Sequence, residues 1–238
     1  MIRQLVIIAL IVGGLILLLI SCKKQQPLEN YVSVLHDVTD SLLAQPEVNE
    51  IMAALQLNEV EKWNGITFRY SKLNEVTYNK QSEVRLNSTS KWLSNELDRK
   101  KEVELFKIKI RESITNEGMP LGRNYSSIYL SMNNELKFLS QKKGNRTLII
   151  YSDLMENSMS ISFYDPEILE RMTNQPDLIK ERLIGTNKLP NLDGISIYII
   201  YEPENIHKDQ TFRIVSNFYK EMLQEQGAAV YISANLTL

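Results

Sequence analysis

The chain has 238 residues, 43% of them hydrophobic and 24% charged, which is the composition of an ordinary globular protein. Its formal net charge is −2 and its pI is near 5.9, and the cations are scattered among acids. This balance gives no electrostatic case for nucleic acid, whose binding usually shows as a basic patch, so no nucleic-acid partner is expected. The length suits one domain with a sizeable core behind a short N-terminal segment.

The first 21 residues have the pattern of a secretory signal peptide. A single early cation, Arg3, precedes an apolar stretch over 5–20 that is slightly short of a membrane span. The residues 19–22 read LISC and resemble the lipobox of bacterial lipoproteins, in which the signal is cut before a cysteine that becomes lipidated. Cys22 is the only cysteine, so the chain cannot form an internal disulfide. The alternative is an uncleaved single-span anchor.

Residues 22–30 form a polar tether that carries Cys22 at its start. The stretch 23–29 reaches at most roughly 25 Å when fully extended, so the domain over 31–238 must lie close to a membrane. Both interpretations of the N-terminus predict a membrane-anchored protein of the cell envelope, on its periplasmic or surface face.

The domain begins with a short apolar run from Tyr31 that predicts a buried strand. The run ends in Asp37, Thr39 and Ser41, which place an acid and two hydroxyls at alternate positions. An open α/β sheet binds its ligand at the carboxyl ends of its strands. These oxygens therefore mark the candidate site.

The rest of the chain alternates between strand and helix patterns. Further strands are predicted over 66–70, 82–86, 146–151, 194–201 and 228–232, the first two as a hairpin with 82–86 at the sheet edge. Helices are predicted over 41–56 (interrupted by Pro46), 90–116, 128–139, 166–172 and 212–226, and 180–191 is expected to be a connection. This alternation predicts a doubly wound α/β fold with a mostly parallel sheet, helices on both faces and one antiparallel edge strand.

The region 31–238 resembles a von Willebrand factor A (vWA) domain. In that family the first strand ends in Asp-x-Ser-x-Ser, a later loop supplies a Thr, and a further strand ends in Asp, together forming a metal-ion-dependent adhesion site. Asp37, Thr39 and Ser41 match the first element, with Thr in place of the first Ser. Asp153 matches the later Asp, at the end of the predicted strand 146–151.

Two positions depart from the family pattern. Ser126 is the best counterpart of the family Thr, and Ser127 is a close alternative. Leu154 follows Asp153 where the family commonly has Gly. A vWA-like fold whose metal site has been lost, leaving these side chains as turn and helix caps, is the alternative interpretation.

The resemblance implies a Mg²⁺ site formed by Asp37, Thr39, Ser41, Ser126 and Asp153. Mg²⁺ takes oxygen ligands in near-octahedral geometry and keeps several waters, which leaves room for one outside ligand. In the family that ligand is often a carboxylate of a partner protein. The expected function is thus a membrane-anchored binding module that recognises a protein partner.

No pattern for catalysis is present, and an enzyme is not expected. The only histidines are His36 and His207, and no His/Cys cluster suits zinc. The nucleophile elbow, the phosphate-binding loop and the dinucleotide fingerprint are absent from the sequence. Two alternatives stay open: a Mg²⁺-dependent phosphohydrolase or phosphotransferase with Asp37 as nucleophile, and a metal-independent structural lipoprotein of an envelope, secretion or conjugation assembly.

Overall fold

The structure is a computed structural model that describes most of the chain. The residues that it describes are 28–38, 42–55, 61–73, 81–91, 94–115 and 126–236. The predicted signal peptide, Cys22, Thr39 and Ser41 lie outside this described part. Among the described residues no helix is long and apolar enough to cross a membrane.

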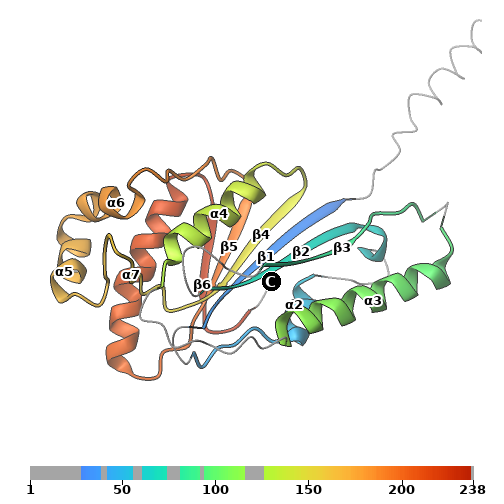
Figure 1. The fold of residues 1–238 in the computed structure, drawn as a ribbon, viewed down its shortest axis with the longest axis horizontal. Coiled ribbons are helices and arrows are strands. Elements are labelled where there is room, and N and C mark those ends of the chain that lie inside the picture. The colour runs from blue at the N-terminus through green and yellow to red at the C-terminus, as the bar shows by residue number, and fades with distance from the viewer. Residues whose placement is uncertain are drawn as a thin grey trace, which may run out of the picture.

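A six-stranded sheet in the order β3-β2-β1-β4-β5-β6 forms the centre of the molecule (Figure 1). Its strands are β1 (Glu29–Asp37), β2 (Gly65–Leu73), β3 (Gln81–Leu86), β4 (Asn145–Tyr151), β5 (Ile195–Ile200) and β6 (Ala229–Ser233). All neighbouring pairs are parallel except β2 and β3, so the antiparallel strand is at the edge. The predicted fold class and the edge position of the hairpin's second strand are confirmed.

Helices cover both faces of the sheet, as Figure 1 shows. The helices are α2 (Val48–Ala54), α3 (Glu96–Thr115), α4 (Ile128–Ser140), α5 (Pro166–Asn174), α6 (Pro176–Ile184) and α7 (Ile206–Gln224), with a 3-10 turn over Glu61–Trp63. Helices α2 and α3 lie on one face, with α3 against β2 and β3. Helices α4 and α7 cover the other face, and α5 packs on both α6 and α7. Helix α2 connects β1 to β2 on one side of the sheet centre, whereas α5, α6 and α7 connect β4 to β5 and β5 to β6 on the other side. Right-handed crossovers place helices on opposite faces when the sheet extends in opposite directions.

The central strands explain why the sheet is buried. Leu148, Ile149 and Ile150 of β4 are all fully buried, because neighbours cover both faces of this strand. A strand that is buried on both faces reads as a continuous apolar run rather than as an alternation. Gly144, just before β4, has φ +132°, and a Cβ there would overlap the Glu29 carbonyl oxygen of β1. Only glycine therefore allows β4 to begin this close to β1.

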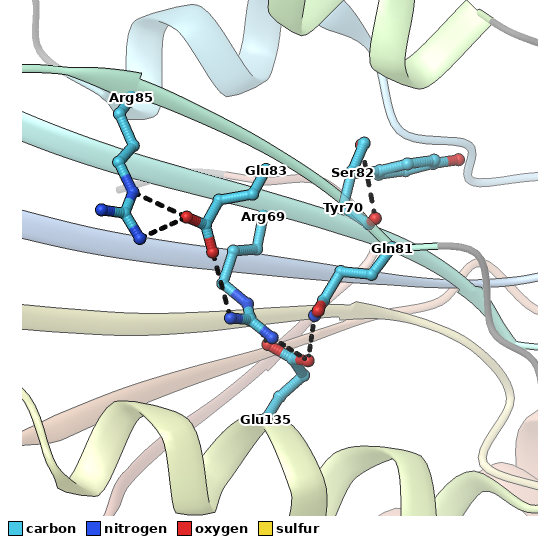
Figure 2. A network of polar contacts seen from close by, with 7 residues as sticks. All are labelled: Arg69, Tyr70, Gln81, Ser82, Glu83, Arg85 and Glu135. Carbon is cyan, nitrogen blue, oxygen red and sulfur yellow. Dashed lines mark hydrogen bonds and ion pairs between the residues drawn. The ribbon is translucent and has the colours of Figure 1, made fainter.

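A polar network fastens the edge strand β3 to helix α4 (Figure 2). Arg69 of β2 donates to both carboxylate oxygens of Glu135 on α4, at 3.0 and 3.1 Å, and to Glu83 of β3 at 3.2 Å. Gln81 of β3 also donates to Glu135, at 2.5 Å. The Arg69 guanidinium lies 3.7 Å from the ring centroid of Phe138, so its flat face is covered as well.

The largest differences from the predicted elements concern four helices. In the segment predicted to be a connection over 180–191, the structure has helix α6 up to Ile184, and Pro176 starts it in the favoured first-turn position. Helix α7 begins at Ile206 rather than at 212, because Asn205 caps it by accepting from the backbone N–H groups of His207 and Lys208. Helix α3 begins at Glu96, not at 90, and α2 is confined to Val48–Ala54.

Candidate functional site

The candidate site lies where β1 and β4 end, side by side. His36 of β1 is in register with Tyr151 of β4, so the next residues are neighbours: Asp37 at the end of β1 and Ser152 just after β4. Ser152 Oγ donates a hydrogen bond to Asp37 Oδ2 at 2.9 Å, across 115 residues of sequence. The strand order reverses its direction of growth between β1 and β4. In open α/β sheets this topological switch point is where ligands bind, outside the carboxyl ends of the strands.

Asp37 is almost completely buried, with 2% of its surface exposed. A buried carboxylate must have hydrogen-bond donors or a positive charge nearby, because its desolvation is costly. The Ser152 hydroxyl supplies one donor, and Ser152 Oγ in turn accepts from the backbone N–H of Leu154 at 2.9 Å. This chain of bonds holds the turn after β4 against the end of β1.

Asp153 follows directly and shapes the same turn. Its Oδ1 accepts from the backbone N–H of Met155 at 3.0 Å, and 9% of the residue is exposed. The next residue, Leu154, has φ +62°, the only positive φ of a described residue other than glycine. This left-handed conformation favours glycine, which is the residue the vWA resemblance would place there. Leu154 is tolerated since its side chain is fully buried in the core.

The structure brings Ser126 to the loop after β4. Ser126 and Asn157 form a short antiparallel bridge, with backbone N···O distances of 2.9 and 3.0 Å. The Ser126 hydroxyl is buried and has no hydrogen-bond partner among the described residues. Ser127 precedes the first turn of α4 without a side-chain capping bond. Of the two serines, Ser126 is therefore the one whose oxygen still needs a partner.

The loop after β4 also carries a buried glutamate, Glu156, which the sequence does not predict as a functional residue. Its Oε2 accepts from the backbone N–H of Tyr129 in the first turn of α4, at 2.9 Å, so it caps that helix from another segment. Burial raises the pKa of Glu156 to about 7, and the charge of Asp37 acts in the same direction. No spacing in the sequence links a glutamate in this loop to a helix that begins 28 residues earlier, since the capping signals known for sequences are local.

His36 lies beneath the site rather than in it. Its Nδ1 is 2.9 Å from the Tyr70 hydroxyl, and its ring meets Tyr151 edge-on, with centroids 6.4 Å apart. Burial lowers the pKa of His36 to about 4, so the ring is neutral at pH 7.

A cavity of about 220 Å³ opens on the α7 side of Asp153. Two of its lining residues, Tyr201 and Phe212, are buried and have ring centroids 4.6 Å apart. The complete lining is Asp153, Met155, Tyr164, Tyr201, His207, Lys208, Thr211 and Phe212. Asp153 therefore belongs both to the turn at the switch point and to the lining of this pocket.

The oxygen atoms of the described site residues could supply part of the ligand set of a hard cation. Asp37 and Asp153 carry carboxylates at the carboxyl ends of β1 and β4. The buried Ser126 hydroxyl, which has no partner among the described residues, is a neutral oxygen ligand. Mg²⁺ prefers oxygen ligands of both kinds. Among the described residues no three His, Cys, Asp or Glu side chains are grouped as a metal site. The site implied by the resemblance needs only two acids, because hydroxyls supply its other oxygens. Thr39 and Ser41, which would supply two of them, lie outside the described residues.

Comparisons with known proteins give little further information. No protein-family model and no curated protein sequence matches the chain. A solved structure of an aerotolerance-related membrane protein from Bacteroides fragilis aligns over 87% of this chain and 92% of that one. Its sequence identity is 13% and its TM-score 0.34, a similarity too low to carry an argument. The fold class, a doubly wound α/β domain of the vWA or Rossmann kind, rests on the sheet order, the strand directions and the placement of the helices.

Proposed function

We propose that this protein is a membrane-anchored binding module that captures a protein partner at the carboxyl ends of β1 and β4. The observation that carries the proposal is the hydrogen bond between Asp37 and Ser152 at the switch point of the sheet. It holds together two acid-bearing turns that the sequence separates by more than a hundred residues. Asp37, Ser126 and Asp153, with Thr39 and Ser41, would hold Mg²⁺, and the ion would supply a positive charge for a partner carboxylate.

The pocket beside Asp153 supports recognition of a protein rather than of a small anion. The rings of Tyr201 and Phe212 give its lining apolar surface, and His207 and Lys208 also line it. Interface anchors are commonly apolar or aromatic side chains that fill such pockets. A partner carboxylate at the ion and a neighbouring apolar side chain in the pocket would bind together. No covalent step is needed, so the proposal is a binding function and not catalysis.

The direction of β1 places the proposed membrane anchor and the candidate site at opposite ends of this strand. The strand has 9 residues and therefore spans about 30 Å from Glu29 to Asp37. If Cys22 is lipidated, the tether leads to the amino end of β1, and the candidate site lies at the far end, directed away from the membrane. This orientation would leave the site open to a partner in the envelope.

Magnesium titration by calorimetry tests the metal-dependent part of the proposal. The full chain, held in detergent micelles, is compared with Asp37→Asn, which keeps the size of the side chain and removes its charge. We expect wild type to bind Mg²⁺ and Asp37→Asn to bind at least about tenfold more weakly, since one of two anionic ligands is lost. Asp98→Asn, an exposed acid on α3, serves as the matched control and should bind like wild type.

Absence of a binding heat in both wild type and Asp37→Asn would overturn the metal site. The partner can then be examined separately by crosslinking in the native cells, with and without EDTA. Release of the crosslinked protein by both EDTA and Asp37→Asn is expected for the proposed module. A partner that stays bound under both conditions would instead support a structural lipoprotein of a larger assembly.

A further inference from the structure

The two edges of the sheet differ in how they are protected against pairing with another strand. Edge strand β3 carries the charged residues Glu83 and Arg85, and charges on an edge discourage further pairing. The opposite edge strand, β6, reads AVYIS and has no charge, no proline and no bulge in its register with β5. Native edge strands usually carry at least one of these safeguards. Strand β6 therefore lacks the features that keep other strands away.

The backbone groups of two residues of β6 point away from β5. The Ser233 backbone oxygen accepts from the Tyr201 N–H at 3.1 Å, so Ser233 pairs toward β5. The pairing direction alternates along a strand, so the N–H and C=O groups of Val230 and Ile232 point outward. No residue in the described part of the chain forms a hydrogen bond with these outward groups. A row of backbone donors and acceptors at this spacing is completed by another strand.

The two faces of β6 offer different surroundings to the side chains of an added strand. Val230 lies in the same row as Arg69, which contacts α4, so Val230 is buried on the face that α4 and α7 cover. Tyr231 lies on the other face and is 50% exposed. Its ring stacks on that of Tyr198 of β5, with centroids 4.9 Å apart and an interplanar angle of 17°. One ring face of Tyr231 is thus covered, and the other is directed outward past the edge.

We propose that β6 is a docking edge for an extended, uncharged segment of a partner protein, which adds a strand beyond β6. The backbone of the added strand pairs with the outward groups of Val230 and Ile232. One of its side chains, aromatic or β-branched, packs on the outer ring face of Tyr231, since such cross-strand pairs stabilise sheets. Strand β6 has 5 residues and spans about 17 Å, so a short segment is enough to cover it.

The proposed membrane anchor argues against a second copy of this chain as the occupant. In a two-fold symmetric pair the β6 strands would run antiparallel, and so would the β1 strands, because β1 is parallel to β6. The two tethers would then leave from opposite ends of strands about 30 Å long, whereas each tether reaches at most roughly 25 Å. A separate protein of the envelope has no such restriction. This choice of occupant rests on the anchor of the proposed function, but the docking edge does not require the Mg²⁺ site.

The test is titration of the full chain, in detergent micelles, with the fluorescently labelled peptide Lys-Thr-Val-Tyr-Val-Thr-Lys, followed by fluorescence anisotropy. The peptide has strand-forming residues at its centre and lysines at its ends for solubility. We expect wild type to bind it and Ile232→Ala, which keeps the outward N–H, to bind similarly. Ile232→Pro should bind at least about tenfold more weakly, because proline removes that N–H and covers its place on the edge.

Two further measurements keep the test decisive if Ile232→Pro weakens the fold. Tyr231→Lys places a charge on the edge, as β3 has, and should also weaken peptide binding at least about tenfold. Tyr164→Lys is the matched control, because Tyr164 is 58% exposed but lines the cavity beside Asp153, and it should bind like wild type. Hydrogen exchange of the backbone amides over 229–233 should become slower when the peptide binds.

The proposal is overturned if wild type does not bind the peptide, or if Ile232→Pro and Ile232→Ala bind it equally well. Slower exchange only outside 229–233 would also overturn it. Asp37→Asn should leave peptide binding unchanged, since β4 and β5 separate β1 from β6. Failure of the Mg²⁺ titration would thus leave the docking edge in place, and failure of the peptide titration would leave the Mg²⁺ site in place.

Discussion

At the scale of single residues, the turn after β4 shows how a leucine is accommodated in a left-handed backbone conformation. Leu154 adopts φ +62°, which costs a non-glycine residue roughly 1–2 kcal/mol. Its fully buried side chain offsets this cost, since burying a leucine stabilises a fold by about 2 kcal/mol. The turn that contains Ser152 and Asp153 can thus adopt this backbone conformation without a glycine.

Two substitutions at this position separate the backbone cost from the packing gain. Leu154→Ala loses the buried side chain and should lower the free energy of unfolding by about 2–5 kcal/mol. Leu154→Gly loses the same side chain but relaxes the backbone, so it should be about 1 kcal/mol more stable than Leu154→Ala. Chemical denaturation measures both.

Leu136, equally buried in the middle of α4, is the control for the Leu154 pair. There the order should reverse, with Leu136→Gly less stable than Leu136→Ala by about 1 kcal/mol, because glycine is a poor helix former. The same order of Ala and Gly at both positions would show that the turn at 154 is not under backbone strain.

Glu156 gives the protein a predictable dependence on pH. Its pKa in the folded state is about 7, above the ordinary value of 4.5, so folding favours the protonated form. The stabilisation is complete below pH 4.5 and is lost as pH rises through about 7, by about 3 kcal/mol in total. Glu156→Gln keeps an oxygen for the Tyr129 N–H and cannot ionise. Relative to wild type, it should therefore become steadily more stable between pH 4.5 and 8.

Denaturation of wild type and Glu156→Gln at several pH values, in EDTA, checks this prediction. EDTA removes cations that would otherwise change the charge around Asp37. The difference between the free energies of unfolding of the two proteins removes the contributions of other titrating groups. One of these is His36, whose lowered pKa makes stability rise with pH on the acid side, opposite to the effect of Glu156. A difference that stays constant across this range would mean that the Glu156 pKa is not raised in the folded protein.

At the scale of elements, the attachment of the edge strand β3 to the rest of the fold depends on one arginine, Arg69. Arg69 bridges β2, β3 and α4, and Glu135, its main partner, has only 6% of its surface exposed. Removing one member of a buried ion pair leaves the other charge unpaired, which is far more costly than losing an exposed pair. Arg99 plays a similar part on the opposite face, where it donates to the backbone oxygens of Lys62, Asn64 and Asn87.

Arg69→Met should lower the free energy of unfolding by about 3–5 kcal/mol, since the buried Glu135 carboxylate loses its cation. Adding Glu135→Gln should recover part of this loss, because an amide needs no counter-charge. Arg85, whose side chain is 64% exposed where it meets Glu83, is the control, and Arg85→Met should cost less than about 1 kcal/mol. Urea denaturation of the four proteins gives the values. Equal losses for Arg69→Met and Arg85→Met would show that the network does not depend on burial.

Periodicity predicted most elements, and the failures have local causes. Strands β4 and β5 were predicted because buried parallel strands are continuous apolar runs. Helix α6 was not, since its nine residues include only two buried ones, Ile179 and Leu183, which is too few to establish a helical period. The early start of α7 depends on a capping side chain, Asn205, whose effect is invisible to a pattern of apolar residues.

At the scale of the whole molecule, the proximity of Asp37 to the turn after β4 was predictable from the sequence. The carboxyl ends of neighbouring parallel strands lie on the same side of a doubly wound sheet. The hydrogen bond from Ser152, the bridge that brings Ser126 to Asn157, and the capping role of Glu156 were not predictable. Each joins segments that are distant in sequence through side chains or irregular backbone, for which no periodic signal exists.

The central place of β1 has a consequence for how the protein is made. Its first neighbour, β2, follows within 36 residues, but its second neighbour, β4, begins only at Asn145. A chain that emerges amino end first therefore exposes one bare side of its middle strand until more than half of it has been synthesised. Unpaired apolar strands aggregate readily. We expect the nascent chain to need shielding by chaperones during that interval, and truncation before β4 to yield insoluble protein rather than a smaller folded domain.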